Sequence, residues 1–309
     1  MRYGVLILPD RRWAESRRRW VRAEELGFDH AWTYDHLMWR WLREKDWFGA
    51  VPTLAAAASA TSRIRLGTMV ASPSFRHPVT FAKELMALDD LSNGRIVCGL
   101  GAGAGVYDDE ATGGTSPSPR ERGERFAEFV ELTDRLLRSP ETSYQGTYYS
   151  AHEVRLHPGC VQRPRLPFAV AATGPRGMRL AASHGDLWVT AGEPGNFELQ
   201  PYEDLVPLFR KQLEALERAC EAVDRDPSTI DRVLLTGGMV DGTMESADSF
   251  FHAAKLYEEI GFTDMVVHWP REEFPYAGSE EVMEEIAARL PGREPATAQH
   301  GPGLRQGKA

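Results

Sequence analysis

The sequence predicts an α/β fold, a (β/α)8 TIM barrel, because strand and helix signals alternate along the whole chain. Eight short apolar runs lack clean polar alternation, as is typical of parallel strands that are covered on both faces. Residues 24–32 and 258–267 repeat one order of helix end, glycine, aromatic residue and strand. A doubly wound open sheet is the alternative fold. We expect one barrel domain over residues 1–290 and a loose tail over residues 291–309.

The expected strands and helices have readable limits. One helix begins after Ser118, which can cap it with Glu121 as its partner, and Pro119 suits the first helical position. Another occupies residues 77–94 and stops at an Asn-Gly pair. The eight strands are expected at residues 2–8, 29–34, 64–70, 95–101, 167–173, 186–191, 231–237 and 264–269.

Three features interrupt this regular pattern. Residues 103–119 form a loop rich in Gly, Ser and Pro after the fourth strand. Residues 141–165 form a short insertion before the fifth strand, with a small hairpin expected around Gln145 and Gly146. A long helix over residues 201–223 contains an early proline, Pro207, which predicts a bend in its first turns.

Composition excludes several classes of partner. A net charge of −9 argues against a surface for nucleic acid or anionic membranes. No apolar run approaches the roughly 20 residues that are needed to span a bilayer. The cysteines, Cys98, Cys160 and Cys220, are too far apart to indicate a zinc site or a disulfide framework. We therefore expect a cytoplasmic protein that acts on a small molecule and has no metal site.

The active site of such a barrel lies at the carboxyl ends of its strands. Polar and small residues gather at these positions, which makes them the candidate site. They are Tyr34, Asp35 and His36 after the second strand, Thr68, Met69, Val70 and Ser72 at the third, Gly99, Gly101, Gly103 and Gly105 at the fourth, Thr173, Gly174 and Arg176 at the fifth, Thr190 at the sixth, and His268 and Trp269 at the eighth.

Two of these strand ends suit a cofactor. The glycines of residues 99–105 would let a flat ring or a sugar-phosphate chain approach the backbone, although they equally suit a tight turn. Their spacing does not match the dinucleotide fingerprint GxGxxG. At the fifth strand, the start of a helix, the Thr173 hydroxyl and Arg176 together suit a phosphate. The alternative is a plain threonine cap with an exposed arginine.

Taken in order, these stretches resemble one known family. The matching motifs are YDHL after the second strand, IRLGTMVASPSFRHP at the third, LSNGRIVCGLGAG at the fourth and PFAVAATGPRGMRLAASHGDLWVT at the fifth and sixth. The chain is similar over residues 1 to about 290 to the luciferase-like flavin- or deazaflavin-dependent oxidoreductases. The resemblance implies a (β/α)8 barrel that binds FMN or coenzyme F420 at the strand ends.

The resemblance also implies roles for individual residues. Asp35 and His36 match an Asp-His pair beside the reactive ring, and a non-prolyl cis peptide would fall at Met69-Val70 against that ring. The expected catalytic residues are therefore His36 and Asp35. The expected cofactor contacts are Asp35, Thr68, Met69, Val70, Gly101, Gly103, Tyr107, Thr173, Gly174 and Arg176.

One position departs from the family pattern. Sugar-phosphate dehydrogenases of this family carry a Glu after the strand-four glycines, where this chain has Ala104. The departure argues against sugar-phosphate oxidation and against a mechanism that needs this carboxylate as a proton donor. Tyr107, Asp108, Asp109 and Glu110 follow closely and offer a substitute.

Aromatic residues near the strand ends predict a flat, partly apolar substrate. Trp39, Trp41, Trp47 and Phe48 follow the second strand, and some of these must simply pack in the core. The expected lining of the substrate pocket is Trp39, Trp47 and Trp269.

The resulting hypothesis is F420-dependent hydride transfer to or from a small substrate with a C=C, C=N or C–OH group. His36 would move the proton, with Asp35 or a backbone group orienting its imidazole; otherwise His36 is a helix-start residue bonded to a carbonyl. One alternative is a two-component monooxygenase that receives reduced FMN from a separate reductase. Another is a barrel that binds flavin without turning it over. The family often forms homodimers through its outer helices, which is the expectation here.

Overall fold

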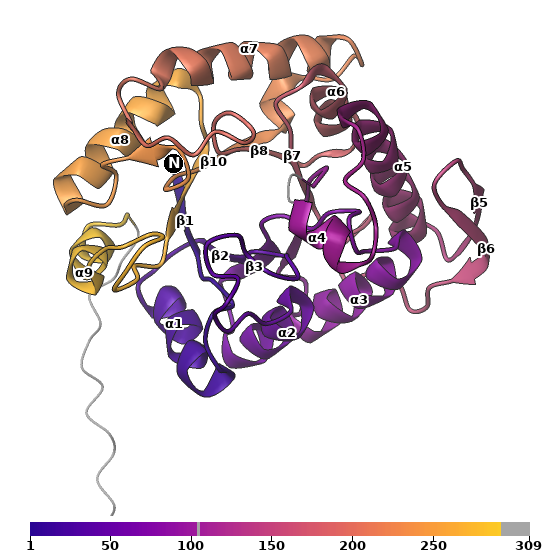
Figure 1. The fold of residues 1–309 in the computed structure, drawn as a ribbon, viewed down its shortest axis with the longest axis horizontal. Coiled ribbons are helices and arrows are strands. Elements are labelled where there is room, and N and C mark those ends of the chain that lie inside the picture. Colours follow the sequence, from indigo (N-terminus) through magenta and orange to yellow (C-terminus); the bar gives the residue numbers. More distant parts are fainter. Residues whose placement is uncertain (104–105, 292–309) are drawn as a thin grey trace, which may run out of the picture.

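The strands of the computed structural model, which describes residues 1–103 and 106–291, close into one parallel barrel (Figure 1). Strand β2 pairs with β1 and completes the ring, which confirms the barrel and rules out the open sheet. Around the barrel the strands are β1 (Arg2–Leu6), β12 (Asp264–His268), β10 (Asp231–Leu235), β8 (Leu187–Thr190), β7 (Phe168–Ala171), β4 (Ile96–Leu100), β3 (Arg65–Thr68) and β2 (His30–Thr33).

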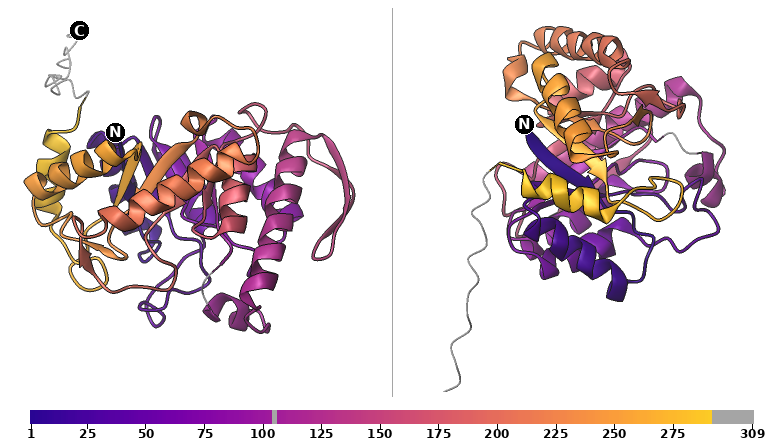
Figure 2. Two further views of the ribbon diagram at one scale, coloured as in Figure 1. Left: turned by 90° about the horizontal axis from the view of Figure 1, so that it is seen from above. Right: turned by 90° about the vertical axis from the view of Figure 1, so that its left-hand side faces the viewer.

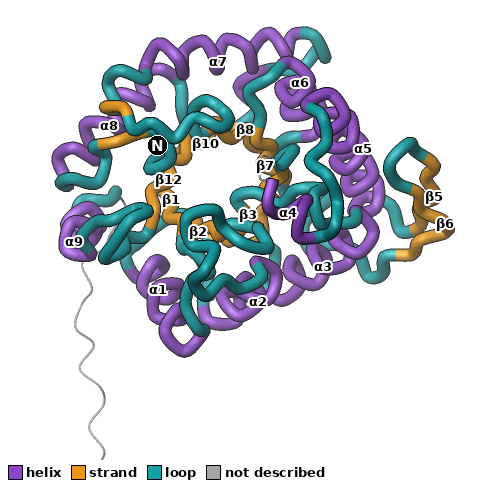
Figure 3. Tube along the Cα trace, in the orientation of Figure 1, coloured by secondary structure: helices purple, strands orange, loops and turns teal. Residues whose placement is uncertain are grey.

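An outer layer of helices surrounds the strands (Figure 3). Ser118 caps α5 as predicted, since its Oγ accepts a hydrogen bond from the Glu121 N–H at 3.3 Å. The predicted bend at Pro207 is wrong, because α7 begins at Val206 and the proline lies in its first turn, where no N–H is required. The outer helices are α1 (Trp13–Glu25), α2 (Ala50–Ala60), α3 (Pro78–Leu91), α5 (Pro119–Arg138), α6 (Pro175–His184), α7 (Val206–Glu221), α8 (Ala247–Ile260) and α9 (Glu280–Ala288).

The strands bury side chains on both faces, which explains their unbroken apolar runs. One set of side chains packs inside the barrel and includes Leu6, Trp32 and Val266. A larger set, which includes Phe168 and Trp188, packs between the strands and the helices. The carboxyl ends of the strands, which form the rim of the barrel, are therefore held in place by packing both inside the barrel and against the helices.

The hairpin predicted before the fifth barrel strand is present beside α5 on the outside of the barrel (Figures 1 and 2). It consists of β5 (Glu141–Gln145) and β6 (Ser150–Arg155), which pair antiparallel. The Glu128 carboxylate of α5 accepts hydrogen bonds from the backbone N–H groups of Thr147, Tyr148 and Tyr149 in the hairpin turn. The hairpin is thereby tied to the barrel.

The insertion after the fourth strand is more ordered than its composition predicts. Residues 106–111 form a short helix, α4 (Val106–Ala111), instead of a plain loop. Smaller elements follow later in the chain: β9 (Gln200–Pro201) pairs with β11 (Val240–Asp241), and η1 (Pro227–Thr229) precedes β10. Ala104, Gly105 and the expected tail beyond residue 291 lie outside the described residues.

None of the helices in the described part of the chain combines the length and the apolar composition that a bilayer crossing requires.

A buried carboxylate joins three strands at the amino end of the barrel. Asp264 of β12 is 1% exposed and accepts hydrogen bonds from Arg2 Nε of β1 at 2.8 Å and from His30 Nε2 of β2 at 3.0 Å. His30 Nδ1 accepts a bond from Trp32 Nε1, so Nε2 carries the imidazole proton. Burial alone would raise the pKa of Asp264, but the bonds from His30 and Arg2 outweigh it and lower the pKa to about 2.

Replacing Asp264 with asparagine is expected to lower the free energy of unfolding by about 3 kcal/mol at pH 7, because the change removes a buried charge that accepts hydrogen bonds from both Arg2 and His30. Asp231→Asn is the matched control. Asp231 contacts the same Arg2 guanidinium at 2.6 Å but is 39% exposed, so a loss of about 1 kcal/mol or less is expected. Urea denaturation followed by circular dichroism measures both losses, and equal losses would contradict the assigned role.

The contribution of Asp264 should also depend on pH. Its pKa is lowered from 3.8 to about 2 in the folded protein, so its stabilisation is complete above about pH 4 and is lost as the pH falls toward 2. The urea midpoints of the wild type and of Asp264→Asn should therefore converge on acidification. A constant difference down to pH 2 would count against this ionisation.

Candidate active site

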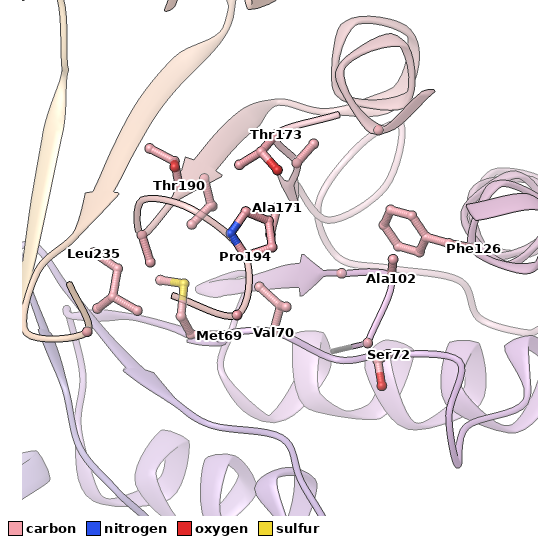
Figure 4. Close-up of a pocket in the computed structure, with 18 of the residues that line it drawn as sticks. Met69, Val70, Ser72, Ala102, Phe126, Ala171, Thr173, Thr190, Pro194 and Leu235 are labelled. Carbon is pink, nitrogen blue, oxygen red and sulfur yellow. The ribbon is translucent and has the colours of Figure 1, made fainter. Parts of the chain in front are cut away.

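A cavity of about 570 Å³ opens at the carboxyl ends of the barrel strands (Figure 4). Its volume lies within the range of about 300–1,000 Å³ that is usual for ligand pockets. Met69 and Leu235 lie toward one end of it, Ala102 and Phe126 lie toward the other, and Val70 lies between them. All five of these side chains are apolar, so this part of the cavity suits a flat organic ring system.

The structure brings many of the residues predicted from the sequence to this cavity. His36 and Trp39 of the β2–α2 loop line it. The Met69-Val70 peptide bond is cis, as the resemblance predicted. The other predicted residues in the lining are Met69, Val70, Gly101, Gly103, Tyr107, Thr173, Gly174 and Arg176. Their roles toward a ligand stay predictions.

Asp35 does not line the cavity. Its side chain is 1% exposed and pairs with Arg76 through both carboxylate oxygens, with 2.7 Å between Arg76 Nη2 and Asp35 Oδ1. Arg76 in turn contacts Glu84 of α3 at 2.9 Å. Asp35 therefore fixes the exit of β2 against the start of α3, and its position gives no support to a direct catalytic or cofactor contact.

Three other predicted residues also lie outside the lining. Thr68 Oγ1 donates to the Gly99 carbonyl at 2.9 Å and so joins β3 to β4. Trp47 Nε1 donates to the backbone carbonyl of His36 at 2.9 Å. Trp269 is 4% exposed and packs in the outer core. Each of them supports the rim from behind, so the expected direct contacts of Thr68, Trp47 and Trp269 with ligands have no support in this geometry.

His36 is oriented by a carboxylate from a distant segment. Its Nδ1 lies 2.6 Å from Asp108 Oδ2 of α4, and Asp108 Oδ1 accepts the Leu37 N–H at 2.8 Å. An ionised carboxylate only accepts hydrogen bonds, so Nδ1 carries a proton, and in the neutral form of the imidazole the lone pair lies on Nε2. The expected orienting group, Asp35 or a backbone group, is therefore corrected to Asp108.

Asp108 was named from the sequence as one possible substitute for the family glutamate, but it was not predicted to contact His36. It is separated from His36 by 72 positions and follows a glycine-rich stretch, so no local spacing links the two. The only signal was the acidic run after the fourth strand. The hydrogen bonds of Asp108 with His36 and with the Leu37 N–H attach residues 106–111 to the β2–α2 loop. This attachment is consistent with a short helix in place of the predicted loop.

The glycines at the end of β4 allow a close approach to the end of β3. A Cβ on Gly101 would lie 2.4 Å from Val70 Cγ2. Gly103 has a φ of +77°, and a Cβ there would lie 2.7 Å from Ser74 Oγ. The chain's own packing thus requires both glycines, whichever ligand the cavity binds.

The start of α6 forms a cationic region of the lining. Gly174 is the N-cap residue and has no side-chain cap bond, so the alternative of a threonine cap at Thr173 is wrong. No heavy atom would lie within 4 Å of a Cβ on Gly174, which leaves the first N–H groups of the helix open. Arg176 of α6 and Arg122 of α5 also line the cavity. Together these groups can hold a phosphate.

A hydrogen-bonded cluster of aromatic side chains closes another part of the rim. Tyr34 Oη lies 2.8 Å from His268 Nε2 and 3.1 Å from Tyr276 Oη. The ring of His268 stacks on Tyr276 at 3.5 Å between centroids. Burial lowers the pKa of His268 to about 3 and raises the pKa of Tyr276 to about 12, so both groups are uncharged at neutral pH.

Comparison with known proteins finds one family. Residues 1–300 match the family described as luciferase-like monooxygenase. A protein of Beutenbergia cavernae named F420-dependent glucose-6-phosphate dehydrogenase is 30% identical over 89% of this chain and 92% of its own length. A protein of the same name from Amycolatopsis mediterranei is 32% identical over 66% of this chain. That match spans 61% of the relative's length.

One further relative is similar in sequence, and two solved structures are similar in fold. A protein of Mycobacterium tuberculosis named F420-dependent hydroxymycolic acid dehydrogenase is 32% identical over 68% of this chain and 54% of its own length. An F420-dependent secondary alcohol dehydrogenase, solved with an F420-acetone adduct, superposes with a TM-score of 0.75 at 18% identity and covers 94% of this chain and 99% of that one. The monooxygenase RslO1 of Streptomyces bottropensis gives a TM-score of 0.71 at 23% identity over 93% and 97% of the two chains.

Replacing His268 with glutamine is expected to reduce the loss of thermal stability on acidification. In wild type, the folded histidine stays neutral down to about pH 3 while the unfolded one gains its proton near pH 6.5. The unfolded state therefore binds more protons between these values, and stability falls as the pH falls. Melting temperatures at pH 7 and pH 5 test this, because the glutamine variant lacks this proton uptake.

The matched control is His152→Gln on the exposed surface of β6. It makes the same chemical change and should keep the wild-type dependence of melting temperature on pH. If His268→Gln loses as many degrees as wild type between pH 7 and pH 5, the buried neutral histidine is not a source of the acid sensitivity.

Proposed function

Because the chain belongs to the luciferase-like monooxygenase family, as its motifs predicted, we propose that it is an F420-dependent oxidoreductase acting on a small, partly apolar organic molecule. The observation that carries the proposal is His36, which lines the cavity with Asp108 on its Nδ1. The named relatives above are F420-dependent dehydrogenases, which supports an oxidoreductase with this cofactor.

The lining fits a deazaflavin cofactor. Met69, Val70 and Ala171 offer an apolar surface for a flat ring. Ser72 lines the cavity, and its buried Oγ has no hydrogen-bond partner among the described residues. The open N–H groups of α6, with Arg122 and Arg176, would hold an anionic tail. When bound, F420 supplies a carrier for a two-electron hydride.

The chain's own part in the reaction is to place and move a proton. Asp108 holds the proton on His36 Nδ1, so Nε2 can accept a proton from a substrate hydroxyl or return one to a developing oxyanion. The charge of Asp108 stabilises the imidazolium that forms. Trp39 lies over His36 at 4.8 Å between ring centroids and limits access of water to the imidazole.

FMN is the second candidate, because its isoalloxazine ring and phosphate suit the same apolar surface and the same helix start. Titrating the protein with each cofactor and following tryptophan quenching tests the choice. F420 is expected to bind at least about tenfold more tightly than FMN, a difference of about 1.4 kcal/mol. Binding of FMN alone would overturn the proposal in favour of a flavin-dependent monooxygenase.

The proposed tail site has its own control within this titration. Arg176→Gln combined with Arg122→Gln should weaken F420 binding by about tenfold, since each residue would lose a charge-assisted bond. Arg179→Gln removes one charge from α6, the helix of Arg176, but Arg179 is exposed and does not line the cavity. Its F420 affinity should match wild type.

Substitution of His36 should separate binding from turnover. His36→Ala is expected to keep F420 affinity within about twofold and to lower kcat by about 100-fold, the usual loss for a general acid-base group. Asp108→Asn should also lower kcat, because the amide no longer fixes the required tautomer. Turnover is measured by F420 absorbance with a panel of enones, imines and secondary alcohols.

Asp109→Asn controls for the loss of charge on α4, because Asp109 neighbours Asp108 but does not line the cavity. It should keep the wild-type kcat. Full turnover by His36→Ala would refute the proton-transfer role. A wild-type protein that binds F420 tightly yet turns over nothing in the panel would favour a binding protein over an enzyme.

A further inference from the structure

Arg40 lines the cavity, although it was not among the residues predicted from the sequence. It belongs to the β2–α2 loop, and its guanidinium carbon lies 4.0 Å from the ring centroid of Phe197 in the β8–α7 loop. Strands β2 and β8 are four places apart in the eight-stranded ring, so they stand on opposite sides of the barrel. The contact therefore joins two loops from opposite sides of the rim.

Aromatic rings hold the Arg40 side chain in place. The same guanidinium carbon lies 5.6 Å from the ring centroid of Trp41 and 5.8 Å from that of Trp39. Trp41 itself packs edge-on against Phe197 at 5.3 Å and Phe274 at 5.2 Å between centroids. A guanidinium that rests on ring faces is oriented and partly removed from water.

The charge of Arg40 has no counterion in the part of the chain that the structure describes. Among the described residues, no carboxylate lies within 4.0 Å of its guanidinium and no oxygen accepts a hydrogen bond from it, although the side chain is half-buried and lines the cavity. Across residues 1–103 and 106–291, the two buried arginines are paired: Arg19 lies 3.5 Å from Asp10, and Arg165 contacts both Asp134 and Asp186. The N–H groups of Arg40 are therefore available to an acceptor on a ligand in the cavity.

The other charged groups of the lining do not meet this need. Asp108 is engaged with His36, and the exposed Glu193 makes no ion pair with Arg40. Arg122 and Arg176 form the cationic region at α5 and α6, which follow β4 and β7. Arg40 follows β2, so the lining has a second cationic position on different strands.

We propose that Arg40 binds the carboxylate of an apolar, flat substrate, an inference that rests on the proposed function for the use of this cavity. Stacking on Phe197 occupies one face of the guanidinium and leaves the N–H groups at its edge for a bidentate carboxylate. The aromatic rings around it suit the apolar body of the same molecule. Arg40 is thus a specificity-determining residue that selects acids over neutral analogues.

Cinnamate and cinnamamide are suitable probes, because both are flat and they differ in charge at one end. Each is titrated into the protein with and without saturating F420, and quenching of tryptophan fluorescence reports binding. Wild type should bind cinnamate at least about tenfold more tightly than cinnamamide, because only the carboxylate of cinnamate can form a charge-assisted pair with the Arg40 guanidinium. Arg40→Met should bind the two equally, and Arg40→Lys should retain part of the preference.

Arg43→Met is the matched control. Arg43 lies on the same loop and is exposed, with its guanidinium 5.1 Å from the ring centroid of Tyr107, and it does not line the cavity. Its loss removes the same net charge, so the preference for cinnamate should persist if local contact with Arg40 is the cause. Loss of the preference in Arg43→Met would show a long-range charge effect and overturn the proposal.

Two further results would also overturn it. One is equal affinity of wild type for cinnamate and cinnamamide, or no binding of either. The other is a fall in F420 affinity in Arg40→Met as large as the fall in cinnamate affinity, which would assign Arg40 to an anion of the cofactor. Failure of F420 to bind wild type, with the cinnamate preference intact, would refute the proposed cofactor and leave the role of Arg40 standing.

Discussion

Closure of the barrel through β1 is the constraint on which the rest of the structure depends. β1 pairs with both β12 and β2, and Asp264 fixes these three strands to one another at their amino ends. Once the ring is closed, the carboxyl ends of all eight strands share one rim. Segments far apart in sequence then meet there, as His36 meets Asp108 and Tyr34 meets His268.

At this rim, the allocation of charge partners decides which groups remain available to a ligand. Asp35 is engaged by Arg76 in a buried pair, and removing either partner would leave an uncompensated charge. Asp108 is engaged by His36 but leaves the imidazole Nε2 free. Arg40 is held by rings alone. The groups that remain available to a ligand are thus His36 and Arg40, whose side chains are oriented by their neighbours but keep hydrogen-bonding capacity that no described residue uses.

Much of the fold was predictable because it depends on local patterns. Apolar runs marked the strands, Ser118 marked the start of α5, and the Gln145-Gly146 pair marked the hairpin. The site was predictable only in part, because Asp35 and His36 lie beyond Thr33, the last residue of β2, where the regular alternation of strand side chains no longer applies. Asp35 turns into a buried pair with Arg76, whereas His36 lines the cavity. The sequence shows both residues but not which one faces the cavity.

The partners of His36 and Arg40 come from segments that follow the strands and have no periodic pattern that could place them. Asp108 lies in the segment after β4, and Phe197 lies in the loop after β8. These two contacts anchor one loop, residues 34–49, at two points: His36 to α4 and Arg40 to the opposite side of the rim. The His36 imidazole and the Arg40 guanidinium, which has no ion-pair partner among the described residues, lie four residues apart on that loop. A shift of either anchor would therefore move both groups, which would couple the proposed proton transfer to the proposed recognition of a carboxylate.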